Sequence, residues 1–307
     1  MLKRTLVFLF FTFITSVGCT GKSEIKSNSL DSVVPATDAG EISKDKNQHV
    51  QSCIDLLNQM PGPYNKMEIE SVCRETQLTE GCMSVNGTPI FHYDKAGVDK
   101  RGKKILALSL IHGDETPSGS VARAWMARLQ NIEPRNSWRV IPVVNPDGFK
   151  QKTRYNANQV DINRNFPSQD WSEKALEHWE KTTNKDKRRY PGPQASSEPE
   201  TRCLVTHLEA FKPDFIISVH TPLGVLDFDG PRISNPGFKP LPWVALGNFS
   251  GSLGRYMWVD NKIPVLTIEL KGNQGMQKLE QFDHLQDISG TVAIQALKAL
   301  DQNSVKK

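Results

Sequence analysis

One short stretch of the sequence constrains the fold more than any other. Residues 105–111 are almost entirely apolar, and this run stops at His112. A run this short and this apolar favours a central strand of an α/β sheet. The following Thr116-Pro117 is typical of a helix start, with Thr as the N-cap and Pro at the first helical position, so a helix is predicted over residues 118–129. His112 and Glu115 are therefore expected at the carboxyl end of a strand, where open α/β sheets bind their ligands.

The rest of the chain repeats this pattern. Three further apolar runs predict core strands, at residues 137–144, 214–219 and 264–268. The second of these runs ends at His220 and the third at Glu269. Predicted strands alternate with predicted helices and no internal repeat is present, which indicates an α/β sheet. One edge of that sheet is expected to gather His112, Glu115, His220 and Glu269.

Local signals predict several further elements. Asn86-Gly87 indicates a hairpin turn, and Pro89 suggests that the strand after it lies at the edge of the sheet. Residues 197–200 read Ser-Glu-Pro-Glu, a capping box that predicts a helix through Phe211. A last helix is predicted over residues 289–300.

The residues expected at the sheet edge suit a metal-dependent hydrolase. Two histidines and one glutamate around a single zinc ion leave one coordination position open, which is the catalytic arrangement. A zinc ion lowers the pKa of water, and a nearby acid that does not bind the metal can move the proton to a leaving amine. Glu269 is the candidate for this general base and acid, because burying an unpaired carboxylate at a strand end would otherwise be costly.

Two arginines ten residues apart, Arg154 and Arg164, lie between the second core strand and His220. One arginine near a zinc site could stabilise an oxyanion, and the other could bind a substrate carboxylate through a bidentate contact. Structural salt bridges are the alternative for both.

These motifs together resemble the zinc carboxypeptidases of the carboxypeptidase A type. The resemblance covers about residues 82–301 and rests on motifs that occur in the family's order: His112-x-x-Glu115, Asn145-Pro-Asp-Gly148, Arg154, Val160-Asp-Ile-Asn-Arg-Asn-Phe-Pro167, His220 and Thr267-Ile-Glu-Leu270. It implies a mixed, mostly parallel eight-stranded sheet flanked by helices, with one zinc ion per chain. The family's site residues would correspond to zinc ligands His112, Glu115 and His220, catalytic Glu269 and Arg154, and carboxylate-binding Asn163 and Arg164.

Within the family, the chain looks like the murein peptide amidase branch. The stretches that carry this likeness include residues 111–115, 190–193, 197–201, 220–224, 226–231 and 251–254. The resemblance implies hydrolysis of peptidoglycan stem peptides at the bond between γ-D-glutamate and meso-diaminopimelate. Two alternatives remain open: a deacylase of N-acyl amino acids, which shares His-x-x-Glu, and a catalytically inactive member that binds peptides. The long motif at residues 161–167 favours the peptidase.

Substrate specificity is expected to involve residues 253–255. Leu253 is expected to line the specificity pocket, and Arg255 either binds an extra substrate carboxylate or is a solvated surface residue. Asp227 and Asp229 follow His220 in an alternating segment. Either they orient a zinc-binding histidine by contacting its ring nitrogen away from the metal, or they face water at the end of a hairpin.

The N-terminus predicts export. Residues 1–19 combine Lys3-Arg4, a short apolar run and Gly18-Cys19, which resembles a lipoprotein signal whose cysteine receives the lipid. A periplasmic location is therefore expected, with membrane contact only through a lipid at Cys19 if this residue is lipidated; ordinary secretion is the alternative. Polar residues 20–49 predict a disordered tether, followed by a helical extension at 50–81 and a catalytic domain at 82–303.

The cysteines and the charge complete these expectations. In an oxidising compartment, Cys53, Cys73, Cys82 and Cys203 could form two disulfides, with three possible connectivities. A formal net charge of +4 does not indicate a nucleic-acid partner.

Overall fold

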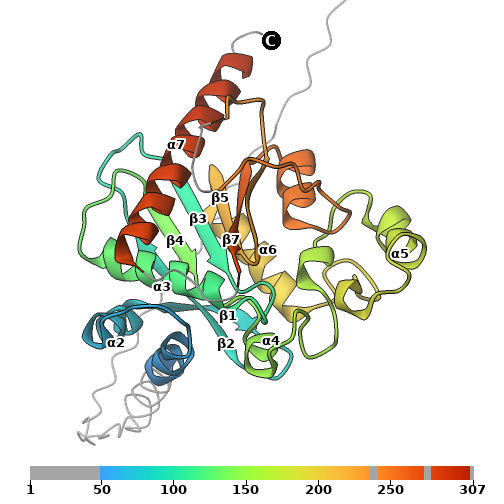
Figure 1. Ribbon diagram of the computed structural model, residues 1–307, viewed down its shortest axis with the longest axis horizontal. Coiled ribbons are helices and arrows are strands. Elements are labelled where there is room, and N and C mark those ends of the chain that lie inside the picture. Colours follow the sequence, from blue (N-terminus) through green and yellow to red (C-terminus); the bar gives the residue numbers. More distant parts are fainter. Residues whose placement is uncertain (1–48, 236–240, 273–277, 305–307) are drawn as a thin grey trace, which may run out of the picture. The chain divides into compact units, whose positions relative to one another are not determined.

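The framework of the molecule is a seven-stranded sheet. The computed structural model describes residues 49–235, 241–272 and 278–304. Within them the strand order is β1-β2-β4-β3-β5-β7-β6. Figure 1 shows these strands as arrows and labels all of them except β6. The strands are β1 (Gln77–Met83), β2 (Pro89–Lys95), β3 (Lys104–Ser109), β4 (Ser137–Ile141), β5 (Phe215–His220), β6 (Leu223–Asp229) and β7 (Val265–Lys271).

The sheet is mixed, as expected for the fold class. The central pairs β4–β3, β3–β5 and β5–β7 are parallel, whereas the outer pairs β1–β2, β2–β4 and β7–β6 are antiparallel. Parallel pairs therefore do not predominate, and the described residues contain seven strands where eight were expected. The short turn between β1 and β2 can join only antiparallel neighbours, because a parallel pair needs a long crossover connection.

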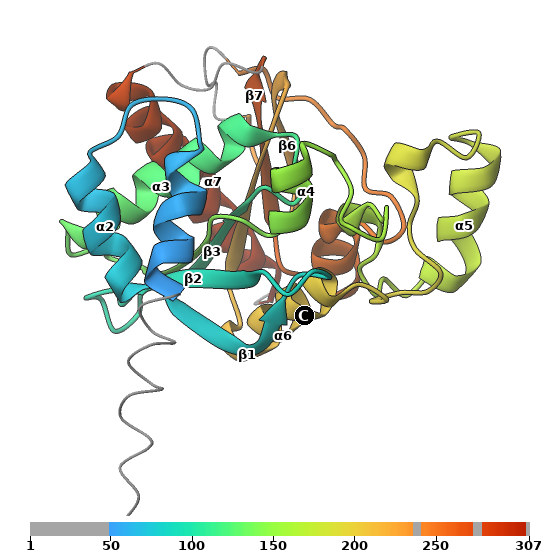
Figure 2. The same cartoon turned by 90° about the horizontal axis from the view of Figure 1, so that it is seen from below.

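Helices cover both faces of the sheet. The helices are α2 (Lys66–Glu75), α3 (Thr116–Gln130), α4 (Pro146–Gln151), α5 (Trp171–Lys181), α6 (Pro199–Phe211) and α7 (Leu279–Ser304). Figure 2 shows α2, α3 and α7 on one side and α6 on the other. The buried apolar residues form two corresponding clusters, one packed under α3 and α7 and one under α6. Every residue of β5 is buried, as expected for a central strand covered on both faces.

Several local expectations need correction. The hairpin at Asn86-Gly87 forms, but β2 is an inner strand, and Pro89 is tolerated because it is the first residue of that strand. The N-cap of α3 is Glu115 rather than Thr116. The capping box at 197–200 does not form: the N-cap of α6 is Glu198, without a side-chain cap, and Glu200 is bonded elsewhere.

Both expected disulfides are present. The N-terminal disulfide, Cys53–Cys73, joins the helix at residues 49–58 to α2. The β1–α6 disulfide, Cys82–Cys203, joins those two elements across the α6 face. Because β1 spans residues 77–83, the expected start of the catalytic domain at residue 82 lies inside this strand.

The expected export signal at residues 1–19, with Cys19, lies outside the described residues, as does nearly all of the expected tether. Among the helices that the structure describes, none combines the length and the hydropathy needed to cross a membrane.

Candidate active site

The site lies at the carboxyl ends of three adjacent parallel strands, β3, β5 and β7. His112 follows β3 after a turn, His220 is the last residue of β5, and Glu269 of β7 is paired in register with His220. The turn after β3 requires Gly113, since a Cβ there would lie 2.0 Å from the carbonyl carbon of Gly148. The structure thus brings together the residues that the sequence placed at one sheet edge.

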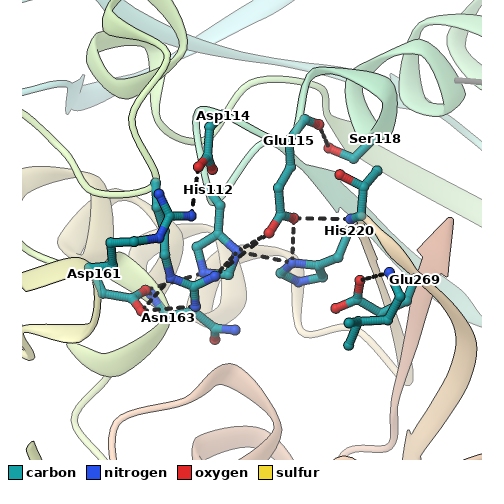
Figure 3. A network of polar contacts seen from close by, with 12 residues as sticks. His112, Asp114, Glu115, Ser118, Asp161, Asn163, His220 and Glu269 are labelled. Carbon is teal, nitrogen blue, oxygen red and sulfur yellow. Dashed lines mark hydrogen bonds and ion pairs between the residues drawn. The ribbon is translucent and has the colours of Figure 1, made fainter. Parts of the chain in front are cut away.

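Three of these side chains form a compact group that fits a metal ion. His112 Nδ1 lies 2.8 Å from Glu115 Oε1, His220 Nδ1 lies 3.0 Å from Glu115 Oε2, and the two Nδ1 atoms are 3.3 Å apart. Ligand atoms at ordinary zinc distances in tetrahedral geometry are about 3.3 Å apart. Figure 3 shows the three side chains turned toward one another, with Glu269 to one side. Two imidazoles and a carboxylate are a donor set that zinc prefers.

The far nitrogen of each imidazole is bonded within the protein. His112 Nε2 lies 3.2 Å from Asp161 Oδ1, and His220 Nε2 lies 2.8 Å from Ser218 Oγ. With a metal ion on Nδ1, His112 would carry its proton on Nε2 and donate it to Asp161, because a carboxylate can only accept. The orienting partners are therefore Asp161 and Ser218, not Asp227 or Asp229 as one alternative had it. Asp161 could have been found from its place in the 160–167 motif.

Burial and neighbouring charges shift the pKa values of this group in opposite directions. Burial alone would raise the pKa of Glu115, but His112 and His220 hold it well below its usual range. Burial also opposes ionisation of Asp161, yet Arg154 and His112 lower the pKa of that carboxyl strongly. Both acids are thus held as anions, the form that a metal ligand and a histidine-orienting partner require.

A cavity of about 200 Å³ opens beside this group. Besides His112 and His220, its walls include five of the residues singled out in the sequence: Arg154, Asn163, Arg164, Leu253 and Glu269. Glu269 is only 8% exposed, and its Oε2 accepts the backbone N–H of Leu223 at 3.4 Å. A buried carboxylate in a cavity next to a metal group is placed where a general base would act.

Arg154 points into the site from the opposite side. Its Nε and Nη2 donate to Asp161 Oδ2 at 3.0 and 2.9 Å, and its Nη1 lies 3.7 Å from Glu115 Oε1. Asp161 therefore fixes Arg154 and His112 at once. A guanidinium held in this way can stabilise negative charge that develops in the cavity.

Asn163 and Arg164 lie on a short 3₁₀ turn, and the Asp161 side chain accepts the backbone N–H of Asn163 at its start. Asn163 Oδ1 accepts the backbone N–H of Leu253 at 2.9 Å, which ties this turn to the helical turn that carries Leu253. The Arg164 guanidinium lies 4.8 Å from the ring centroid of Phe249. Burial lowers the pKa of Arg164 to about 10, so it remains a cation at neutral pH.

The structure does not bring Arg255 to this cavity. Its Nη2 lies 3.0 Å from Asp170 Oδ2, and both residues line a separate cavity near α5. The π-helical turn Arg255–Asp260 begins at this residue and directs its side chain toward α5. Leu253, two residues earlier, is 2% exposed and lines the same cavity as Glu269.

Comparisons with known proteins agree with this geometry. Residues 90–226 match the zinc carboxypeptidase family. A murein peptide amidase A of Vibrio campbellii is 30% identical over 199 residues, which cover 61% of this chain and 76% of that protein. The chain belongs to the zinc carboxypeptidase family. It is accordingly a metallopeptidase-type hydrolase, and its His112-Glu115-His220 group fits the zinc ion that the family name implies.

Solved structures agree as well. The murein-tripeptide amidase of Escherichia coli O157 is 27% identical with a TM-score of 0.52, covering 71% of this chain and 91% of that one. A carboxypeptidase A of Helicoverpa armigera, 14% identical with a TM-score of 0.52, shares the fold over 85% of this chain and 80% of its own. The carboxypeptidase-like fold expected from the sequence is confirmed.

Proposed function

We propose that this protein is an exported zinc-dependent amidase that hydrolyses peptidoglycan stem peptides at the γ-D-glutamyl–meso-diaminopimelate bond. One observation carries the proposal: a metal-fitting group, a buried carboxylate and two arginines converge on one cavity. The relatives named murein peptide amidase A support the substrate class. Export is supported by the two disulfides, which persist in oxidising compartments.

The residues of the cavity divide the chemistry among them. Zinc, when bound, supplies Lewis acidity that polarises a carbonyl and lowers the pKa of water. The Glu269 carboxylate takes the proton from the attacking water and passes it to the leaving amine. Arg154 donates hydrogen bonds to the oxyanion that develops at the scissile carbonyl.

Asn163 and Arg164 bind the carboxylate of the residue that is released. An arginine is suited to this role because its planar guanidinium binds a carboxylate through two parallel hydrogen bonds. Leu253 forms part of the cavity wall beside them.

The test is to incubate the purified chain with L-Ala-γ-D-Glu-meso-diaminopimelate, with and without a chelator, and to identify products by mass. Release of free diaminopimelate that the chelator abolishes and zinc restores supports the proposal. Turnover confined to α-linked C-terminal residues would instead indicate an ordinary carboxypeptidase. Turnover of N-acyl amino acids alone would indicate a deacylase, and binding of the peptide without turnover an inactive member.

Glu269→Gln gives a sharper test of the assigned base. The variant is expected to bind zinc like the wild type, since Glu269 is not among the metal-fitting residues, and to lose activity by a factor of about 10²–10⁴. Glu68→Gln on α2 is the matched control and should retain full activity. A Glu269→Gln variant that remains active would show that Glu269 is not the general base.

A further inference from the structure

Two acidic residues of β6 lie on the same face of the sheet as Glu269. In the antiparallel pair β6–β7, Val225 is opposite Glu269, Asp227 is opposite Thr267, and Asp229 is opposite Val265. Directly opposed residues point to the same face. The two aspartates therefore extend the floor that carries the catalytic carboxylate, and both line the catalytic cavity.

The spacing of residues along β6 determines how far the side chain of a released amino acid must reach to contact Asp227. Two residues of an antiparallel strand span about 7 Å, so Asp227 lies about one such step deeper than Glu269. A released amino acid has its new amine beside Glu269. A group on its side chain four carbon–carbon bonds from Cα reaches roughly 5 Å, and a nitrogen on that carbon slightly farther. Such a nitrogen arrives at the depth of Asp227.

The charge of the two aspartates is not balanced by the described chain. Asp227 is 6% exposed and accepts the backbone N–H of Phe228 at 2.9 Å, while Asp229 Oδ1 accepts Asn248 Nδ2 at 2.9 Å. Burial and the neighbouring carboxylate Asp229 raise the pKa of Asp227 to about 6, and no cation is among the groups that shift it. Burial likewise raises the pKa of Asp229. A cationic group entering the cavity would stabilise both anions.

The two arginines that line the cavity interact with Asp161 and not with this pair of aspartates. Arg154 is bonded to Asp161, whose charge also acts on Arg164. Gly254, in the helical turn just before Arg255, shapes the other end, since a Cβ there would lie 1.8 Å from Asp229 Oδ2. A side chain at this position would have to displace the Asp229 carboxylate from its place in the cavity.

We propose that Asp227 and Asp229 bind an ammonium group on the side chain of the amino acid that hydrolysis releases. This inference rests on the proposed function, under which that amino acid is meso-diaminopimelate, whose distal carbon bears such an ammonium. Asn163 and Arg164 bind the carboxylate next to the scissile bond, and the aspartate pair selects the far end of the side chain. The pair is thus a specificity subsite, separate from the catalytic carboxylate Glu269.

The experiment compares three peptides that differ only in their third residue: meso-diaminopimelate, lysine, which keeps an ammonium, and 2-aminopimelate, which keeps only the distal carboxylate. The wild type should favour the two ammonium-bearing peptides. Asp227→Asn should lower kcat/KM for these two by about 10–100-fold, mainly through KM, and should not lower it for the 2-aminopimelate peptide, whose distal carboxylate loses a like-charged neighbour. Glu200→Gln, which neutralises an equally buried carboxylate outside the cavity, is the control and should not alter the ranking.

Equal loss on all three peptides, or a wild type that prefers 2-aminopimelate, overturns the inference. If the variant does not fold, inhibition of the wild type by free meso-diaminopimelate and by free 2-aminopimelate decides instead: the first must bind more tightly. The proposed function can fail independently. In that case the γ-D-glutamyl peptides are not cut at all, while α-linked peptides ending in lysine are cut with the same dependence on Asp227.

Discussion

Asp161→Asn is the substitution that probes the site most directly. The fully buried carboxylate accepts hydrogen bonds from His112 Nε2, from two nitrogens of Arg154 and from the backbone N–H of Asn163. Asparagine keeps the shape and one accepting oxygen but replaces the other with an NH₂ group. If the amide oxygen still accepts from His112, the NH₂ group faces the N–H donors of Arg154. Two donors then face each other, and the buried ion pair with Arg154 is lost.

The expected magnitude follows from these contacts. Removing a partner that orients a metal-binding histidine typically weakens metal affinity by about 10–100-fold, or roughly 1.4–2.8 kcal/mol. Losing the Asp161 charge leaves Arg154 with only its longer ion pair to Glu115, which costs up to about 3–5 kcal/mol of folding free energy. Zinc competition against a chromophoric chelator measures the first effect, and urea unfolding measures the second.

Asp99→Asn is the control for Asp161→Asn, because Asp99 is paired with the largely exposed Arg135 and contributes little. The reasoning is refuted if Asp161→Asn binds zinc as tightly as the wild type while remaining folded. Asp161 would then be a structural ion-pair partner of Arg154 and not a determinant of the metal site.

Two further predictions concern stability. Replacing the cysteines of the β1–α6 disulfide by alanine should lower the free energy of unfolding by about 5 kcal/mol, and replacing those of the N-terminal disulfide by about 3 kcal/mol. The difference is expected because the two disulfides close loops of 121 and 20 residues. Equal or reversed losses, measured as shifts in denaturant midpoint, would contradict this loop-entropy argument. Burial lowers the pKa of His92 to about 4 and of His207 to about 3, so the unfolded chain binds more protons below about pH 6.5. Stability should therefore fall by roughly 3 kcal/mol for each histidine, or about 6 kcal/mol in all, between about pH 6.5 and pH 4, and His207→Gln should flatten this profile of Tm against pH.

The positions of His112, His220 and Glu269 could be predicted from the sequence because each follows a short apolar run. Burial on both faces makes a central parallel strand an uninterrupted apolar segment, so its carboxyl end is visible as the point where the run stops. His220 and Glu269 were found in this way, and the structure pairs them in register. The same reasoning could not place Pro89, since whether a strand is inner or outer depends on the strands added beside it.

Residues that act through non-local contacts were harder to predict. The direction of Arg255 depends on its ion pair with Asp170, which is 85 residues away in the sequence. Nor could the sequence reveal that Glu200 would bond to Asn156 instead of capping its own helix. In each case a partner distant in the sequence competes with the local interaction, and local patterns do not record such partners.

The orientation of Asp227 and Asp229 follows from what β6 buries on its other face. Leu226 is fully buried and Phe228 packs beside it, its ring 5.7 Å from that of Trp243, on the side of the sheet covered by α3 and α7. Side chains alternate along a strand, so burying these two residues turns both aspartates toward the catalytic cavity. A slip of one residue would expose Leu226 and place apolar side chains in the cavity instead, at a cost of several kcal/mol in lost burial. The acidic character of the cavity floor is therefore enforced by an apolar core on the opposite face of the same strand.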